Sequence, residues 1–520
     1  MYSLLIKNAK VIDGTGKPGE VLDVAVEKDK IVNIDKNIPS SAESVIDADG
    51  KILTPGFVDL QNHSDAYLQI FDNPSLDSLV TQGYTTALLG NCGASLAPLL
   101  SPESLKSMQK WHSLEGANIN WQSFAEFLQE LSKRKFGLNL GSLVGYSTLR
   151  RGVVADQVRP LEKNEFRSIA KILEESLEAG AFGLSSGLSY SHEIIISELE
   201  LFELAKIVKK SDALFSVHLR SEGSDILEAL DEALDIAKNT EVNLKIAHLK
   251  IKGRQNFPKF SEVVSDLENA FHRGVNANFD VYPYTSVWQP LYSYLPKWAV
   301  EGGRNTLLGN LKDAVQRNKI LLYLNSTGVK FSEMIVASTG SGLSANGKTI
   351  GQIAKNLGES SEQAVLQLIQ NGGSEVLVFE DSLDESQVRE LLFHPLSFIG
   401  TDGAGFSSKQ QNKLVHPRCF GTAPKFLRLA AEAKISLETA VKKLTSAPAK
   451  KAGLKGRGEI KIGGFADLNL FDPAKFADKS GYTNPFQYAE GMDYVFVNGI
   501  AAVSEGKITS QLPGRVLRKK

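Results

Sequence analysis

Most of the chain alternates between short apolar runs and longer amphipathic segments, which is the pattern of buried strands followed by helices. Segments such as residues 164–179 and 198–209 carry apolar residues at three- and four-residue spacing and predict helices. Eight strand–helix repeats are the number that closes a (β/α)8 barrel, so we expect an α/β protein built on a TIM-like barrel. The eight apolar runs cover residues 56–60, 85–89, 138–144, 181–184, 214–217, 243–247, 275–280 and 396–400.

The two ends of the chain follow a different pattern. Residues 1 to about 54 and the stretch from about 456 onwards contain short alternating strands broken by glycine turns. Each end is too short to bury a core of its own, so we expect both to pair into one small β-sandwich. The predicted domains are residues 1–54 and 456–520 for the sandwich and residues 55–455 for the barrel.

The connection between the last two barrel strands is unusually long. It spans roughly 110 residues, whereas loops without structure of their own seldom exceed about 15 residues. We therefore expect an inserted lid or subdomain at about residues 285–345 that covers the mouth of the barrel.

Two histidines follow neighbouring strands of the predicted barrel. Residues 213–248 form a strand, a helix and a second strand, with His218 and His248 at the carboxyl ends of the strands. A right-handed crossover places such strands side by side, about 4.8 Å apart, so both imidazoles reach one rim of the sheet. This pairing favours a metal site, although each histidine could instead end its strand and bond to a loop.

Further ionisable side chains fall at other strand ends, where a barrel builds its active site. His63 and Cys92 follow the first two strands, and Cys92 lies between glycines that permit a tight turn. A thiolate and two imidazoles with an open position match a catalytic zinc site. Asp402 follows the last strand and could move a proton to and from water. The alternatives are a buried structural cysteine and an aspartate that caps a turn.

Candidate substrate-binding residues lie close to these positions. Lys250 and Arg220 each follow a predicted ligand by two residues, and either could hold a carboxylate. Tyr282 could donate a hydrogen bond to a substrate or simply pack beside proline, and Tyr190 is a weaker candidate. The remaining histidines fall in helices or loops, where a surface or structural role is expected: His112, His192, His272, His394 and His416.

The composition limits the classes of function. The chain has 520 residues, 42% hydrophobic and 23% charged, and a net charge of −2, so it offers no overall basic field for nucleic acid or an anionic membrane. Cys92 and Cys419 are its two cysteines, which excludes a disulfide framework. With no charged leader and no long apolar run, we expect a cytoplasmic protein, with the basic tail 515–520 in solvent. The oligomeric state is not predicted.

Several motifs resemble the D-aminoacylase (N-acyl-D-amino-acid deacylase) family of the amidohydrolase superfamily. The likeness runs from near the N-terminus to Pro513-Gly514-Arg515. The motifs include Pro55-Gly56-Phe57-Val58-Asp59, Gly90-Asn91-Cys92-Gly93, Gly187-Leu188-Ser189-Tyr190, His218-Leu219-Arg220-Ser221-Glu222, His248-Leu249-Lys250, Asp280-Val281-Tyr282-Pro283-Tyr284, Thr401-Asp402-Gly403 and His416-Pro417-Arg418.

The resemblance implies a distorted barrel and zinc-dependent hydrolysis of the amide bond of an N-acylated D-amino acid. It also implies that Cys92, His218 and His248 hold the zinc and that Asp402 is the general acid and base. By the same likeness, Lys250 with Tyr282 would bind the α-carboxylate of this small-molecule substrate.

Two positions depart from the family. The chain reads Gln61-Asn62-His63 where the superfamily carries His-x-His, so only His63 remains there. Glutamine is a poor zinc ligand beside imidazole or thiolate, so we expect one tightly bound zinc and a second position in question. Tyr146 stands where relatives usually carry histidine.

Alternatives to the deacylase hypothesis are a hydrolase of another small amide, such as a D-amino-acid-containing dipeptide or an N-carbamoyl compound, and a catalytically silent barrel that acts as a binding protein. The departures at Gln61 and Tyr146 motivate the silent barrel. The presence together of Cys92, His218, His248 and Asp402 argues against it.

Overall fold

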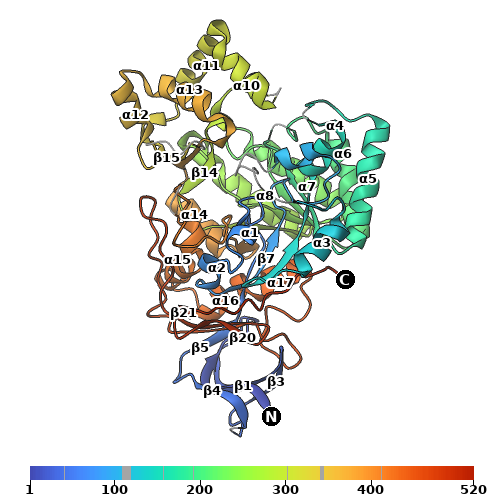
Figure 1. Ribbon diagram of the computed structural model, residues 1–520, viewed down its shortest axis with the longest axis vertical. Coiled ribbons are helices and arrows are strands. Elements are labelled where there is room, and N and C mark those ends of the chain that lie inside the picture. The colour runs from blue at the N-terminus through green and yellow to red at the C-terminus, as the bar shows by residue number, and fades with distance from the viewer. Residues whose placement is uncertain are drawn as a thin grey trace.

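Three parts of the molecule follow one another along its long axis (Figure 1). The structure, a computed structural model, describes residues 1–39, 41–107, 119–155, 157–190, 192–300, 303–339, 345–410 and 413–520. A sheet built from both ends of the chain lies at the bottom of the view, the barrel lies in the middle, and a mostly helical insertion lies at the top.

The barrel contains all eight predicted strands. Its strands are β6 (Phe57–Asp59), β7 (Tyr84–Leu89), β8 (Asn139–Ser142) continued by β9 (Val144–Gly145), β10 (Gly183–Gly187), β11 (Leu214–His218), β12 (Asn243–Ile246), β13 (Ala277–Val281) and β17 (Ser397–Ile399). They form two parallel arcs, β6-β7-β8 and β17-β13-β12-β11-β10-β9. A bridge between Asn62 and Gly403 joins the arcs at their carboxyl ends. The predicted TIM-like barrel is confirmed.

The barrel is distorted where its third strand breaks between β8 and β9. Only β9 pairs with β10, so the lower part of β8 has free backbone groups on that side. The C-terminal tail satisfies them: Leu140 N donates to Arg515 O at 2.9 Å, and Leu517 N donates to Leu140 O at 2.7 Å. Our expectation that residues 515–520 lie free in solvent is therefore wrong, because unpaired strand edges need a partner.

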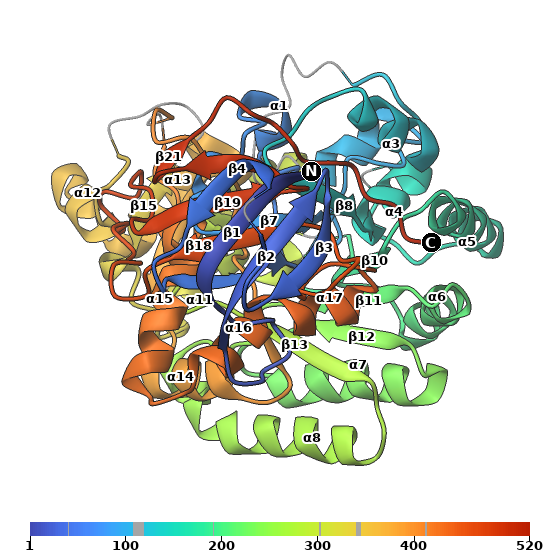
Figure 2. The ribbon, with the colours of Figure 1, turned by 90° about the horizontal axis from the view of Figure 1, so that it is seen from below.

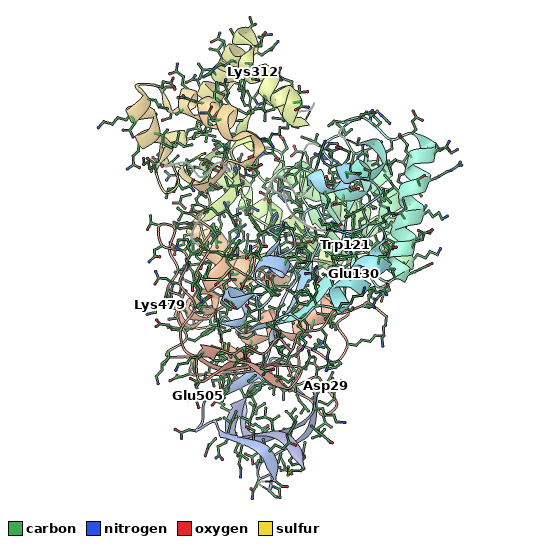
Figure 3. All side chains as sticks on the ribbon, in the orientation of Figure 1. Asp29, Trp121, Glu130, Lys312, Lys479 and Glu505 are labelled. Atoms are coloured by element: carbon green, nitrogen blue, oxygen red, sulfur yellow. The ribbon has the colours of Figure 1, made fainter. Side chains whose placement is uncertain are left out.

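The tail also ties the barrel to the other parts of the fold. Lys519 N donates to Gly180 O at 3.0 Å, and Leu517 packs against the apolar cluster that contains Val58 and Phe182. The Arg515 guanidinium pairs with Asp29 of the terminal sheet at 2.5 Å, and Asp29 is labelled at the lower right of Figure 3.

Amphipathic helices surround the barrel. Figure 2 shows α7 and α8 on its outer side, beyond β12 and β13. In α7 (Ile226–Thr240), apolar residues at three- and four-residue spacing are buried against the strands. The other helices of the barrel part are α1 (Gln69–Asp72), α2 (Asp77–Val80), α3 (Phe124–Ser132), α4 (Tyr146–Val154), α5 (Lys163–Glu178), α6 (Glu198–Lys210), α8 (Phe260–His272), α14 (Glu385–Phe393), α15 (Arg418–Glu432), α16 (Leu437–Leu444) and α17 (Ser446–Ala452).

The two ends of the chain share one nine-stranded sheet. Its strands are β1 (Tyr2–Val11), β2 (Glu20–Glu27), β3 (Lys30–Asp35), β4 (Ala42–Asp47), β5 (Ile52–Pro55), β18 (Leu468–Phe471), β19 (Met492–Val497), β20 (Ile500–Ser504) and β21 (Lys507–Ile508). Antiparallel pairing of β5 with β18 joins the N-terminal and C-terminal strands, and β4 branches from β1. The core of this part draws on both ends, for example Val24 and Phe496.

The insertion has its own sheet and core. It contains β14 (Ser286–Pro290), α9 (Lys297–Val300), α10 (Gly303–Lys312), α11 (Ala314–Ser326), β15 (Ile335–Ser338), α12 (Ile350–Leu357), α13 (Ser361–Gly372) and β16 (Leu377–Asp381). Because β16 pairs with both β14 and β15, the inserted part runs past residue 345, where we expected it to end, and returns only at Asp381.

Within the described ranges, no helix is both long enough and apolar enough to span a bilayer.

Candidate metal centre and active site

The strand ends bring the predicted ligands together. His218 is the last residue of β11, Cys92 and His248 follow β7 and β12, and all three side chains are buried. One ligand atom from each lies within 4.8 Å of the other two. Cys92 Sγ is 3.4 Å from His248 Nε2, and the two imidazole rings meet edge to face, with centroids 4.5 Å apart. The three donors can converge on one ion.

A second group of potential ligands shares Cys92. His63, Cys92 and Asp402 also place ligand atoms within 4.8 Å of one another. His63 Nε2 is 3.1 Å from Asp402 Oδ1 and 3.8 Å from Cys92 Sγ. The thiolate therefore stands between two candidate metal positions.

The backbone turns sharply at three of these residues. Cys92, His248 and Asp402 have φ angles of 53°, 38° and 45°, in the left-handed region that non-glycine residues seldom adopt. Such conformations cost about 1–3 kcal/mol each and cluster at functional sites. Gly90, at φ 73°, lies so close to Leu143 that a Cβ there would be 2.2 Å from its carbonyl oxygen. The glycine that precedes Asn91 and Cys92 is therefore required by the turn.

The pKa values of Cys92 and His248 are both shifted toward their charged forms. Burial alone would raise the pKa of Cys92, but the neighbouring histidines, His248 first, hold it well below its usual range. Burial likewise opposes charge on His248, but the nearby anions Asp402 and Cys92 raise its pKa to about 10. Without an ion, imidazolium balances the thiolate. A bound metal would take the place of that proton, so metal binding should release protons.

Asp402 is kept ionised by Arg418, a residue that the sequence pattern did not single out. Burial by itself would raise the pKa of Asp402, but Arg418, His248 and His63 together hold it well below its usual range. Arg418 Nη2 donates to Asp402 Oδ2 at 2.7 Å, and Arg418 Nε donates to the Asp402 carbonyl at 2.7 Å. The arginine thus fixes both the side chain and the strained backbone of Asp402.

Glu222 supports His248 from behind. Its Oε1 lies 3.1 Å from His248 Nδ1 and 2.5 Å from Lys250 Nζ. For His248 Nε2 to bind a metal, Nδ1 must carry the proton. Nδ1–H can then donate a hydrogen bond to the Glu222 carboxylate but not to Lys250, because an ammonium cannot accept a hydrogen bond. A carboxylate behind a ligating histidine fixes its tautomer and raises its basicity.

Lys250 and Tyr282 present donors close to the cluster. Lys250 Nζ donates to Glu222 and, at 3.0 Å, to the His248 carbonyl. Its third proton faces no acceptor among the described residues once His248 Nδ1 is protonated. The buried Tyr282 hydroxyl has no hydrogen-bond partner in the described part of the chain, and the Arg418 guanidinium lies 4.6 Å from its ring. Both residues can donate a hydrogen bond to a substrate carboxylate.

Arg220, a predicted substrate-binding residue, makes its described contacts with α7 and with the loop before α6. It forms a two-point ion pair with Glu232 on α7, and its Nη1 and Nη2 donate to the carbonyls of Ile194 and Ile196. These contacts anchor the loop before α6.

The other tyrosines divide between site and scaffold. Tyr190 packs against the candidate ligand His218 with ring centroids 5.0 Å apart, which places it beside the site. Tyr146, at the departure noted above, is buried, and its hydroxyl donates to Glu200, which also binds Arg150. Its role is structural.

Among the remaining histidines, His416 is held by contacts within the scaffold. His416 is buried among aromatic rings and binds the Ser286 carbonyl, and burial with the nearby Arg418 charge holds its pKa well below its usual range. His112 lies outside the described residues.

Three charged residues around the cluster, Glu222, Arg418 and Lys245, left some signal in the sequence although the pattern did not single them out. Glu222 stands four positions after His218 in one of the family motifs, and Arg418 ends another. Lys245 is a charged residue inside an apolar strand, which is unusual for a side chain that is fully buried. None of the three could be assigned a partner from spacing alone.

The donor set fits zinc. A cysteine thiolate and two imidazoles, with room for one more ligand, are the ligands that a catalytic zinc takes in proteins. A parallel barrel with such a cluster and an ionised aspartate at its carboxyl face defines a metal-dependent hydrolase.

Comparison with known proteins agrees with this class. The profile described as Amidohydrolase family matches residues 359–501. D-aminoacylase from Alcaligenes xylosoxydans xylosoxydans is 30% identical over 100% of this chain and 98% of its own length. N-acyl-D-aspartate deacylase from the same organism is 30% identical over 99% of this chain and 94% of its own. The chain therefore belongs to the D-aminoacylase family of amidohydrolases.

A solved structure supports the same relationship. N-acyl-D-glutamate deacylase from Bordetella bronchiseptica, complexed with zinc and a phosphonate inhibitor that mimics the tetrahedral intermediate, superposes with a TM-score of 0.84. It is 26% identical, and the match covers 99% of both chains. Similarity over the whole length means that the terminal sheet and the insertion are shared as well as the barrel.

Proposed function

We propose that this protein hydrolyses the amide bond of N-acyl-D-amino acids and that it holds one zinc ion on Cys92, His218 and His248. The observation that carries the proposal is the convergence of these three ligands beside the ionised Asp402 at the carboxyl face of the barrel. Full-length similarity to D-aminoacylase, and to a deacylase that binds zinc, supports the metal and the substrate class.

The chain's own residues provide the proton transfers. A zinc ion bound here supplies Lewis-acid polarisation of the amide carbonyl and makes water more acidic. Asp402, held ionised by Arg418, accepts the proton of the attacking water and returns it to the nitrogen of the leaving amine. His63 Nε2 lies 3.1 Å from Asp402 Oδ1 and steadies the carboxylate between these two transfers.

Substrate orientation depends on a carboxylate clamp. The free proton of Lys250 and the unpartnered hydroxyl of Tyr282, among the described residues, both lie next to the cluster. We assign them to the α-carboxylate of the substrate, which needs donors that the metal ligands do not supply. Charge-assisted hydrogen bonds of this kind contribute about 1.5–3 kcal/mol each, so Lys250→Ala should lower kcat/KM at least about tenfold.

A hydrolysis screen tests the proposal. The purified zinc-loaded protein is incubated with N-acetyl-D- and N-acetyl-L-forms of leucine, phenylalanine, aspartate and glutamate, and the free amino acid is quantified. Turnover of D-forms in preference to L-forms is the expected result. Turnover of dipeptides or N-carbamoyl compounds alone would identify another amide as the substrate. The absence of any hydrolysis with zinc bound would overturn the proposal.

A further inference from the structure

A buried lysine lies directly beneath the metal cluster. Lys245, in the middle of β12, is fully buried, and its ammonium binds Asp280 Oδ1 at 2.6 Å and Gln61 Oε1 at 2.6 Å. Asp280 is also buried and neutralises the lysine. Its second oxygen accepts a hydrogen bond from the backbone N–H of His248 at 3.0 Å. The roles assigned above do not explain why a lysine stands here.

The lysine fixes the orientation of the Gln61 amide. An ammonium has donors and no acceptor, so the amide oxygen of Gln61 must face it. The NH2 group then points the other way, at Cys92 Sγ at 3.1 Å and Asp402 Oδ1 at 3.4 Å. Gln61 is therefore held as a hydrogen-bond donor toward the thiolate and the carboxylate.

These two acceptors belong to the second group of potential metal ligands. An ion on His63, Cys92 and Asp402 would need the lone pairs that face Gln61. In the first group Gln61 contacts Cys92 alone, whose sulfur keeps further lone pairs for an ion, because the described contacts of the Gln61 side chain reach neither His218 nor His248.

We propose that Lys245 and Gln61 together act as a fixed polar substitute for a second metal ion, so that the centre binds one divalent ion per chain. The amide NH2 of Gln61 stabilises the negative charges of Cys92 and Asp402, as a second cation would. Asp402 is then not needed as a metal ligand. The inference rests on the proposed zinc site, but it concerns metal stoichiometry and does not depend on which amide is hydrolysed.

Metal titration tests the proposal without an activity assay. Zinc and cobalt are titrated into the metal-free protein, and bound ions per chain are counted by calorimetry, by elemental analysis and from the absorption of thiolate-bound cobalt. The wild type should bind one ion tightly, with no second ion below about 1 mM, a concentration at which binding is worth about 4 kcal/mol. Two ions bound with comparable affinity would overturn the proposal.

Two variants should open the second position. Gln61→Glu replaces the donor with a carboxylate that still accepts from Lys245, and it should bind a second ion at least tenfold more tightly than the wild type. The double variant Lys245→Met with Asp280→Asn removes both buried charges together, because removing one would leave the other unpaired. The amide of Gln61 can turn in this variant, so a second ion should bind.

A matched control uses the buried ion pair of Arg457 and Asp467, which lies in the terminal part of the fold. Arg457→Met with Asp467→Asn should keep one ion per chain. A single-ion result for Gln61→Glu overturns the proposal, and this variant decides the matter if the double variant does not fold. If the wild type hydrolyses none of the amides, the proposed function is overturned but the ion count is unchanged. A failure of the proposed function can therefore be told apart from a failure of this inference.

Discussion

Glu222→Gln should weaken zinc binding although Glu222 is not a proposed ligand. The carboxylate accepts the Nδ1 proton of His248 at 3.1 Å and balances Lys250 at 2.5 Å. Loss of a carboxylate behind a ligating histidine lowers metal affinity about 10- to 100-fold. This corresponds to about 1.4–2.7 kcal/mol, since each factor of ten is worth about 1.4 kcal/mol. Lys250 is also left buried without this counterion, so stability should fall.

Competition with a chromophoric zinc chelator at fixed pH measures the effect. Glu232→Gln is the matched control, because it also breaks a glutamate ion pair on a neighbouring segment, that with Arg220, but touches no proposed ligand. The control should keep wild-type zinc affinity within about twofold, well under the 1.4 kcal/mol of a tenfold change. Wild-type affinity in Glu222→Gln would refute the reasoning. An equal loss in both variants would do so too, because it would indicate general loosening of the barrel.

Four further predictions address the site and the scaffold. Cys92→Ser should lose most of its zinc on dialysis, measured by elemental analysis, because a hydroxyl is a harder and weaker ligand than a thiolate. Asp402→Asn should retain zinc but lower kcat by about 10²- to 10⁴-fold, and loss of the ion would contradict its role in proton transfer. Deleting residues 515–520 removes three backbone hydrogen bonds, to Leu140 and Gly180, and should lower the free energy of unfolding in urea by about 3 kcal/mol. An unchanged free energy of unfolding would mean that the tail contributes nothing to the fold. Hydrogen bonds from Arg159 and from the backbone N–H of Glu162 lower the pKa of Glu165 to about 2. The stability that ionised Glu165 contributes is therefore complete above about pH 4.5 and is lost as the pH falls through about 2. The difference in free energy of unfolding between the wild type and Glu165→Gln should shrink, and not grow, as the pH is lowered from about 4.5 to about 2.

Much of the fold could be predicted from local pattern. The period of two or of three to four residues in the apolar positions depends on strand and helix geometry alone, so the eight barrel strands and helices such as α7 followed from the sequence. Parallel strands bring their carboxyl ends together, so the same pattern predicts that Cys92, His218, His248 and Asp402 meet at one rim. The D-aminoacylase likeness added the substrate class.

Interactions between distant side chains could not be predicted in this way. Arg220 satisfies the same two-residue spacing as Lys250 and yet binds Glu232, because partner choice depends on where α7 lies. The C-terminal tail is basic, which favours a position in solvent. Its backbone nevertheless pairs with the free edge of β8. Backbone groups are the same in every residue, so this pairing could not be predicted from the sequence.

The sequence by itself determined the eight barrel strands, the residue types at their carboxyl ends and the absence of a histidine at Gln61. Only the tertiary structure decided what stands in place of that histidine. Lys245 and Gln61 are far apart along the chain and meet because β12 lies across the barrel interior from the end of β6. Hydrogen bonds and ion pairs act over about 3–4 Å, so their partners are set by the closed barrel and not by neighbours in sequence. Charge placement around Asp402 follows from the same closure, since Arg418 reaches it only from the start of α15.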